Sequence, residues 1–296
     1  MRGEQEMLEL IMHVAERDER IRAVYMNGSR TNSLVRKDLF QDYDIVYVVT
    51  ETASFLTDEQ WIQKFGDLLM VQEPDKHDLA LGKEVDFARS YGYLMLFTDG
   101  NRIDLHLIAT EYFSEADIDD SLTIPLLDKD GCMPPVPVPT DKDYHVMPPT
   151  EGEFQSCTNN FWWCLQNVAK GIWRDQLPYA MAMFHKPVRE ALDQMISWWI
   201  GMQHDYQVSV GAMNKYFKFY LPEPYWLMYE RTYTEANYTQ MWQSIFVACE
   251  LFRTLGKEVA KAFDYPYPEQ SDCLMTQYLQ HVQTLPAEAT TLNLRL

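Results

Sequence analysis

The most informative stretch of the sequence runs from Gln41 to Val49 and reads QDYDIVYVV. Its last five residues are β-branched or aromatic, which is typical of a strand of this length. Asp42 and Asp44 lie at the start of that strand, and side chains alternate along a strand, so both carboxylates point to one face. Two such carboxylates repel each other unless a cation lies between them. The pair therefore indicates a site for Mg²⁺, which binds a few carboxylates together with phosphate oxygens.

A glycine turn precedes this pair in the chain. Gly28 and Ser29 follow a short strand predicted over residues 21–26, and Ser29 lies thirteen residues before Asp42. Gly28 lets the backbone approach a phosphate closely, while the Ser29 hydroxyl and nearby N–H groups can donate hydrogen bonds to its oxygens. The turn and the carboxylates together favour a site that binds phosphate and Mg²⁺.

A third carboxylate, Asp104, belongs to a second strand signal. Residues 91–98 and 102–109 are strand-like runs joined by Asp99-Gly100-Asn101, which is typical of a hairpin. A polar group on such an apolar strand costs free energy unless it has a partner. If this strand lies beside the first, the three carboxylates converge on one or two metal ions. The alternative is that all three pair with surface arginines or lysines.

The rest of the chain predicts an α+β first domain and a helical second domain. Residues 4–19 have the spacing of an amphipathic helix, and a capping box at Thr57–Gln60 predicts a short helix through Phe65. Six of the fifteen prolines lie between Gly131 and Pro149, which indicates a linker. Helical periods follow over residues 150–174, 188–199 and 241–259. We therefore expect domains at 1–133 and 150–296, joined by a linker at 134–149.

Composition narrows the class of protein. The 296 residues include 44 acidic and 25 basic side chains, for a formal charge of −19. This charge argues against a nucleic-acid partner and is compatible with a cationic one. The sequence has no apolar run of membrane-spanning length, no signal peptide and no C-x-x-C pair among its five cysteines. These features predict a cytoplasmic protein that is not bound to a membrane, without disulfides or a zinc site.

The order of strand, Gly-Ser turn, Asp-x-Asp strand and distant strand aspartate resembles the nucleotidyltransferase superfamily. Further motifs look like the aminoglycoside 6-adenylyltransferases, the streptomycin-modifying branch, and they extend from the first helix to about Pro268. They are GSR at 28–30, QDYDI at 41–45, YLMLF at 93–97, IDL at 103–105, DYHV at 143–146, AKG at 169–171 and MISW at 195–198. The resemblance implies a mixed nucleotidyltransferase-type sheet with flanking helices, followed by an all-helical bundle that binds substrate.

The same resemblance implies a reaction: AMP passes from ATP to a hydroxyl of a cationic aminoglycoside, and pyrophosphate leaves. The expected acceptor is the 6-hydroxyl of streptomycin, and the outcome is antibiotic resistance. Asp42 and Asp44 would then hold Mg²⁺ on the triphosphate, and Asp104 would bind a second metal beside the attacking hydroxyl. Asp104, or a carboxylate of the helical domain, could take the hydroxyl proton.

Several basic residues are candidates for contacting the nucleotide, beside Gly28 and Ser29. Lys170 and Arg174 are four residues apart and hence on one helix face, and the resemblance places Lys170 on the ATP phosphates. A solvated basic face beside Asp175 is the alternative. Arg30 could contact phosphate or pair with an acidic neighbour.

Substrate binding requires anions, because streptomycin carries two guanidinium groups and carboxylates bind guanidinium through paired hydrogen bonds. The candidates lie in the helix over 188–199, where aromatic side chains could also stack on the cation or simply fill the core: Glu190, Asp193, Trp198 and Trp199. Two other functions stay open, a different small-molecule or protein acceptor and a non-catalytic nucleotide-binding module. We expect a monomer or a weak homodimer.

Overall fold

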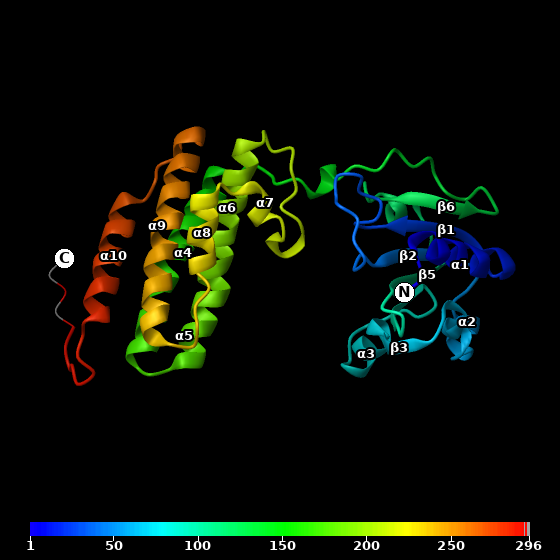
Figure 1. The fold of residues 1–296 in the computed structure, drawn as a ribbon, viewed down its shortest axis with the longest axis horizontal. Coiled ribbons are helices and arrows are strands. Elements are labelled where there is room, and N and C mark those ends of the chain that lie inside the picture. Colours follow the sequence, from blue (N-terminus) through cyan, green and yellow to red (C-terminus); the bar gives the residue numbers. More distant parts are fainter. Residues whose placement is uncertain (293, 295–296) are drawn as a thin grey trace. The chain divides into compact units, whose positions relative to one another are not determined.

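The computed structural model describes residues 1–292 and 294. The chain divides into two compact units, Met1–Asp143 and Tyr144–Leu296. The division lies inside the proline-rich segment over residues 134–149. Figure 1 labels most helices and strands of both units.

The first unit is built on a six-stranded sheet with the order β3-β4-β5-β2-β1-β6. Only β2 and β5 pair in parallel, and the other neighbours are antiparallel, so the sheet is mixed as expected. The strands are β1 (Ile21–Asn27), β2 (Tyr43–Val49), β3 (Leu68–Gln72), β4 (Ser90–Phe97), β5 (Arg102–Ala109) and β6 (Ile124–Asp128). The predicted hairpin of β4 and β5 is confirmed, and it turns at Gly100 with a φ of +85°.

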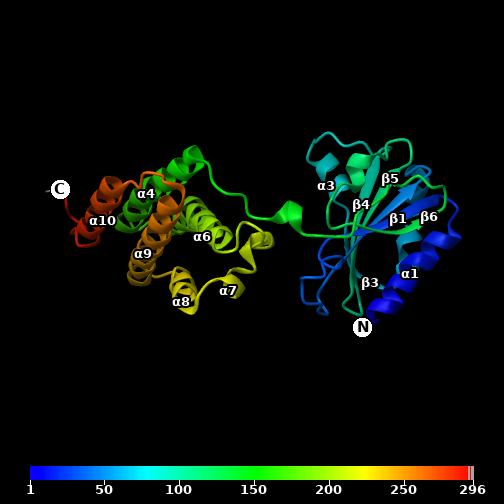
Figure 2. The same ribbon diagram turned by 90° about the horizontal axis from the view of Figure 1, so that it is seen from above.

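Helix α1 (Glu4–Arg17) covers one face of this sheet (Figure 2). Its apolar side packs on the strands, and the Tyr47 hydroxyl donates a hydrogen bond to the Ile11 carbonyl at 2.6 Å. Rings of Trp61 and Phe65 complete the same core from a short 3₁₀ helix, Trp61–Phe65. A smaller apolar cluster that includes Tyr25 lies apart from this core. The burial of both β2 faces explains its continuous apolar sequence.

The predicted start of a helix at the Thr57 capping box is wrong, although a short 3₁₀ helix does end at Phe65. Thr57 instead ends helix α2 (Ala53–Thr57), where its hydroxyl donates to the Ala53 carbonyl at 2.8 Å. The Gln60 N–H, which the capping box would have paired with Thr57, donates instead to Asp58 Oδ1 at 3.3 Å. Helix α3 (Pro74–Ala80) connects β3 to β4 along the chain.

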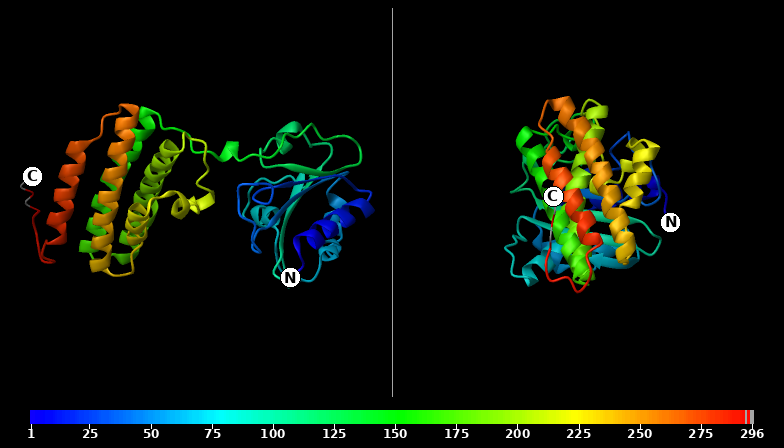
Figure 3. Two further views of the ribbon diagram at one scale, coloured as in Figure 1. Left: turned by 45° about the horizontal axis from the view of Figure 1, so that its top comes forward. Right: turned by 90° about the vertical axis from the view of Figure 1, so that its left-hand side faces the viewer.

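The second unit is helical, which confirms the α+β class of the whole chain. Its long helices run side by side, with α9 on α6 and α10 on α4 (Figure 3). The predicted capping box at its entrance is present: the Glu153 N–H donates to Thr150 Oγ1, and the Thr150 N–H donates to Glu153 Oε2. The helices are α4 (Glu151–Trp173), α5 (Leu177–Met183), α6 (Arg189–Gln203), α7 (Phe217–Tyr220), α8 (Glu223–Arg231), α9 (Tyr238–Phe263) and α10 (Glu269–Gln283), with a π-helical turn at Phe184–Val188 before α6.

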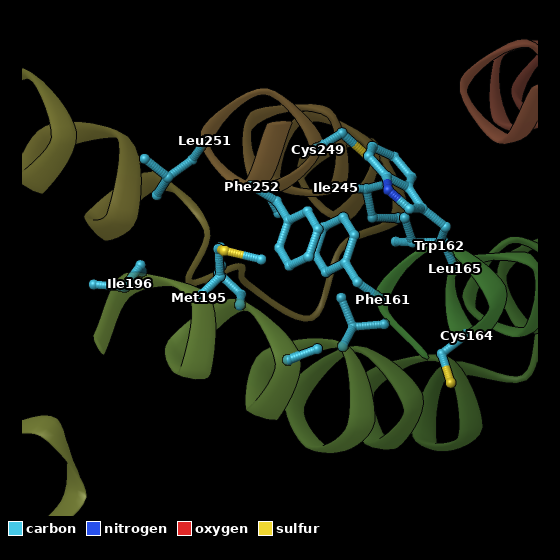
Figure 4. Close-up of a cluster of buried hydrophobic side chains, with 14 of the residues drawn as sticks. Phe161, Trp162, Cys164, Leu165, Met195, Ile196, Ile245, Cys249, Leu251 and Phe252 are labelled. Atoms are coloured by element: carbon cyan, nitrogen blue, oxygen red, sulfur yellow. The ribbon is translucent and has the colours of Figure 1, made fainter. Parts of the chain in front are cut away.

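The bundle core centres on aromatic rings from α4 and α9 (Figure 4). Phe161 and Phe252 stack at 3.8 Å between ring centroids, and Trp162 meets both rings edge-on. The apolar residues that recur every three or four positions along α9 are buried, which confirms the prediction that they pack in the core. Across the residues that the structure describes, every helix is too short or too polar to cross a bilayer. The five cysteines are free thiols.

Candidate active site

The parallel pairing of β2 and β5 brings the predicted carboxylates to one place. Asp44 on β2 lies opposite Asp104 on β5 in the strand register, and Asp42 immediately precedes β2. The condition stated from the sequence, that the two strands be neighbours, is therefore met. Asp42, Asp44 and Asp104 are called the carboxylate cluster below.

Asp44 is the member of this cluster that lacks a partner. Burial, together with the negative charges of Asp104 and Asp42, raises its pKa to about 6. Among the residues with described positions, none donates a hydrogen bond to its carboxylate or forms an ion pair with it. A partly buried carboxylate with like charges beside it is a strong site for a cation.

The Gly28 turn lies directly against Asp44. Asn27, at the end of β1, is opposite Asp44 in the register, and Gly28 follows with a φ of +79°. A Cβ atom at Gly28 would lie 2.1 Å from Asp44 Oδ2, so any other residue would displace the carboxylate. Gln41 Nε2 donates to the Ser29 carbonyl at 3.3 Å, which joins the turn to the segment that carries Asp42.

Arg102 completes the site and was not identified from the sequence. Its Nε and Nη2 donate to the two Asp104 oxygens at 2.7 and 2.6 Å, and its Nη1 lies 3.3 Å from Asp42 Oδ2. The alternative that the aspartates pair with arginine thus holds for Asp42 and Asp104 and fails for Asp44. Arg102 is two residues before Asp104 on the same strand face, and this spacing was the available signal.

The donor set of the cluster suits a hard divalent cation, since it offers carboxylate oxygens on adjoining strands and one of them is unpaired. Within residues 1–292 and 294, however, no three Asp, Glu, His or Cys side chains form a ready-made metal site. The guanidinium of Arg102 lies between two of the three carboxylates. Asp42 and Asp44, with Asp104 beside them, are the residues that would hold Mg²⁺.

Arg30 holds in place the backbone segment that carries Asp42. Its guanidinium donates to the carbonyls of Asp42 and Gln41 at 3.0 and 2.7 Å and lies 3.7 Å from the centroid of the Tyr43 ring. Its side chain is only 6% exposed, with Glu4 at 3.7 Å. These contacts fix the backbone that carries Asp42, and they leave the Arg30 guanidinium little freedom to reach a phosphate.

The structure places Lys170 and Arg174 at the C-terminal end of α4, in the helical unit. Arg174 is the C-cap of that helix. The neighbouring Gly171 has a packing role, because a Cβ there would lie 3.0 Å from the Cβ of Ala180 in α5. A role for Lys170 and Arg174 on the phosphates stays a prediction.

The helical unit contains a cavity of about 650 Å³ between α4, α6 and the segment leading into α4. Two of the four predicted substrate residues, Glu190 and Trp198, line it, together with Glu153, Asn160 and Tyr144. We call this the helical-unit cavity. Two carboxylates and an aromatic ring are groups that can bind an organic cation.

The other two predicted substrate residues, Asp193 and Trp199, do not line this cavity. The Asp193 oxygens accept hydrogen bonds from Asn214 Nδ2 at 3.2 Å and from the Tyr229 hydroxyl at 3.0 Å. Trp199 Nε1 donates to Glu258 Oε2 at 2.6 Å. Both side chains are used inside the bundle, and the helix period alone could not separate them from Glu190 and Trp198.

Comparisons with known proteins show which chains this sequence resembles. A family model described as streptomycin adenylyltransferase matches residues 1–282. The chain is 40% identical over 268 residues to an aminoglycoside 6-adenylyltransferase of Campylobacter jejuni, covering 90% of this chain and 92% of that protein. It is 37% identical over 286 residues to an aminoglycoside 6-adenylyltransferase of Bacillus subtilis (strain 168), covering 95% and 98%. A crystal structure of an aminoglycoside 6-adenyltransferase from Bacillus subtilis aligns with a TM-score of 0.48 at 34% identity, covering 96% of this chain and 100% of that one.

Proposed function

The chain belongs to the streptomycin adenylyltransferase family, and from this membership we propose that it is an enzyme that transfers AMP from ATP to a hydroxyl of an aminoglycoside. The observation that carries the proposal is the register of Asp44 opposite Asp104, with Gly28 against Asp44. We propose streptomycin as the acceptor, its 6-hydroxyl as the modified group, and antibiotic resistance as the consequence. We expect a cytoplasmic monomer or weak homodimer without a nucleic-acid partner.

In this proposal, Asp42 and Asp44 would hold Mg²⁺, and Asp104 would hold a second divalent cation. Bound Mg²⁺ supplies positive charge that stabilises the triphosphate and the departing pyrophosphate. The chain's own groups position the reactants: Gly28 lets the turn lie directly against Asp44, and Ser29 offers its hydroxyl and N–H as donors to phosphate.

The reaction itself forms one bond and breaks one bond. The acceptor oxygen attacks the α-phosphorus, and the bond from that phosphorus to the oxygen bridging the β-phosphorus breaks. Pyrophosphate leaves with the electron pair of that bond. The proton of the attacking hydroxyl passes to a carboxylate oxygen of Asp104, once Arg102 no longer occupies it. A general base in this position typically contributes about 10²–10⁴-fold to the rate.

The acceptor's charge fits the chain's charge. An aminoglycoside is a polycation, and a net charge of −19 attracts it at long range. We propose that the helical-unit cavity binds part of the aminoglycoside, with Glu190 and Glu153 facing its cationic groups and Trp198 against its apolar surface. Pairing of a carboxylate with a guanidinium gives both strength and orientation.

The test is a mass spectrum of the acceptor. Purified protein is incubated with Mg-ATP and streptomycin, and with other aminoglycosides in parallel. We expect streptomycin to gain the mass of one AMP residue, and the gain to be lost in Asp44→Asn. A matched control is Asp130→Asn, which removes the same charge at a surface ion pair with Arg22. A gain on another aminoglycoside would contradict only the streptomycin assignment, whereas no gain on any of them would contradict the proposed reaction.

A further inference from the structure

The guanidinium of Arg102 occupies the position where the proposed function needs a cation. Three of its nitrogens contact carboxylate oxygens, two on Asp104 and one on Asp42. Asp44 is left without any such contact. Two members of the carboxylate cluster therefore share the single positive charge of Arg102.

Arg20 forms a comparable ion pair with Asp18, but other groups also hold its guanidinium. Arg20 forms the same two-bond fork with Asp18, also two residues away in the sequence, at 2.9 and 2.6 Å. Arg20 is held by further groups as well: its Nη1 donates to Ser54 Oγ at 2.9 Å, and its guanidinium lies 4.0 Å from the centroid of the Phe55 ring. These contacts would keep Arg20 in place even if Asp18 took another partner.

Arg102 has no such support. Over the part of the chain with described positions, its guanidinium contacts only Asp104 and Asp42, and its side chain is 42% exposed. A cation that takes these carboxylates would remove every contact that holds the guanidinium. The side chain can then turn into solvent without breaking a packed core.

We propose that Arg102 is an exchangeable counterion that holds Asp42 and Asp104 in place until a divalent cation displaces it. This inference rests on the proposed function, because it takes the carboxylate cluster as the metal site. In this role the arginine reduces the repulsion among the three neighbouring carboxylates, and it competes with a metal ion that binds without nucleotide. Arg102 is thus a positioning residue for the cluster.

The test is the affinity for Mn²⁺ alone, a cation that prefers the same oxygen ligands as Mg²⁺ and whose free ion is measured by electron paramagnetic resonance. Full-length wild-type protein is titrated without nucleotide beside Arg102→Gln. Removal of the competing guanidinium should strengthen Mn²⁺ binding about tenfold, the equivalent of about 1.4 kcal/mol. Arg20→Gln, which opens the matched fork away from the site, should leave the affinity unchanged.

Two further variants separate displacement from a general effect of charge. Arg102→Lys keeps the positive charge but cannot form the fork, so displacement predicts an affinity between those of the wild type and Arg102→Gln. In the double variant Arg102→Gln with Asp44→Asn, the gain in affinity should disappear. Circular dichroism spectra that match the wild type establish that each variant is folded.

Each outcome bears on the inference. Equal Mn²⁺ affinity in wild type and Arg102→Gln, or an Arg102→Lys affinity equal to that of the wild type, would overturn the counterion role and leave the metal assignment intact. If Mn²⁺ binds to neither protein, both the counterion role and the metal assignment fail. The acceptor mass spectrum then decides separately whether adenylyl transfer occurs.

Discussion

At the scale of the residue, Asp44 combines partial burial, two carboxylate neighbours and the absence of a donor among the described residues. Its pKa in the folded chain, about 6, is above its ordinary value of 3.8. The free energy of unfolding therefore decreases as this carboxyl ionises. The loss is nearly absent below about pH 3, grows as the pH rises through 3.8 towards 6, and is complete above about pH 7.

Asp44→Asn should accordingly stabilise the metal-free protein at pH 8. The expected gain is about 1–2 kcal/mol in the free energy of unfolding, after allowance for solvent screening. The gain should nearly vanish at about pH 3, where Asp44 is largely protonated in both the folded and the unfolded chain. Urea denaturation at both pH values, with EDTA present, measures it. A variant that is less stable than the wild type at pH 8 would show that Asp44 has a stabilising partner.

Gly28→Ala should damage the site and the fold together. The new Cβ would meet Asp44 Oδ2 at 2.1 Å, and the backbone φ of +79° disfavours a side chain. We expect a loss of about 1–3 kcal/mol in unfolding free energy and a loss of adenylyl transfer. Gly82→Ala is the matched control, because Gly82 has the same φ and open space around it. An unchanged transfer rate in Gly28→Ala would contradict the close approach of the turn to Asp44.

The site residues differ in how far the sequence could identify them. Strand alternation was sufficient to place Asp42 and Asp44 on one face, and the apolar setting of Asp104 indicated that it needs a partner. The roles of Arg30 and Arg102 depend on which groups the folded chain places within reach of each guanidinium. Arg30 contacts backbone carbonyls and Arg102 contacts carboxylates. The two-residue spacing of Arg102 and Asp104 on one strand face was the available signal for their pairing, whereas no spacing in the sequence indicates that Arg30 contacts backbone carbonyls.

At the scale of the element, the long and strongly periodic segments were predicted well. The capping box at Thr150 gives the start of α4, and the apolar period gives α9. Strand β3 was missed because most of its side chains are exposed, which removes the alternation that marks a strand. Strand β6 was missed because it is short and contains Pro125, a residue that argues against a strand unless it lies at an edge.

The contact between α4 and α9 makes a prediction about stability. Phe252→Ala removes the ring that stacks on Phe161 in the bundle core (Figure 4), and such a cavity costs about 3–5 kcal/mol. Phe219→Ala is the control in the same unit, since Phe219 is 81% exposed and its loss should change the unfolding free energy by less than about 0.5 kcal/mol. Urea denaturation followed by circular dichroism at 222 nm measures both. Equal effects of the two substitutions would contradict the described core.

At the scale of the whole molecule, the charge of −19 should act on the binding of a cationic acceptor. Salt shortens the range of this attraction, because the screening length falls from about 10 Å at 0.1 M to about 3 Å at 1 M. We expect the KM for the aminoglycoside to rise severalfold between 0.05 and 0.5 M KCl, in line with the roughly 10–10³-fold effects of electrostatic steering on association. Initial rates at fixed, saturating Mg-ATP measure this dependence. A KM that is independent of salt would indicate that local contacts alone recruit the acceptor.

The most direct test of the proposed active site is the transfer of AMP by Asp104→Asn in a single turnover. ATP labelled in its α-phosphate is mixed with excess enzyme and the aminoglycoside, and the label on the acceptor is followed in time. If Asp104 takes the hydroxyl proton beside Asp44, the transfer rate should fall by about 10²–10⁴-fold while the variant remains folded. A rate within about threefold of the wild type would contradict the assignment of the carboxylate cluster as the catalytic centre.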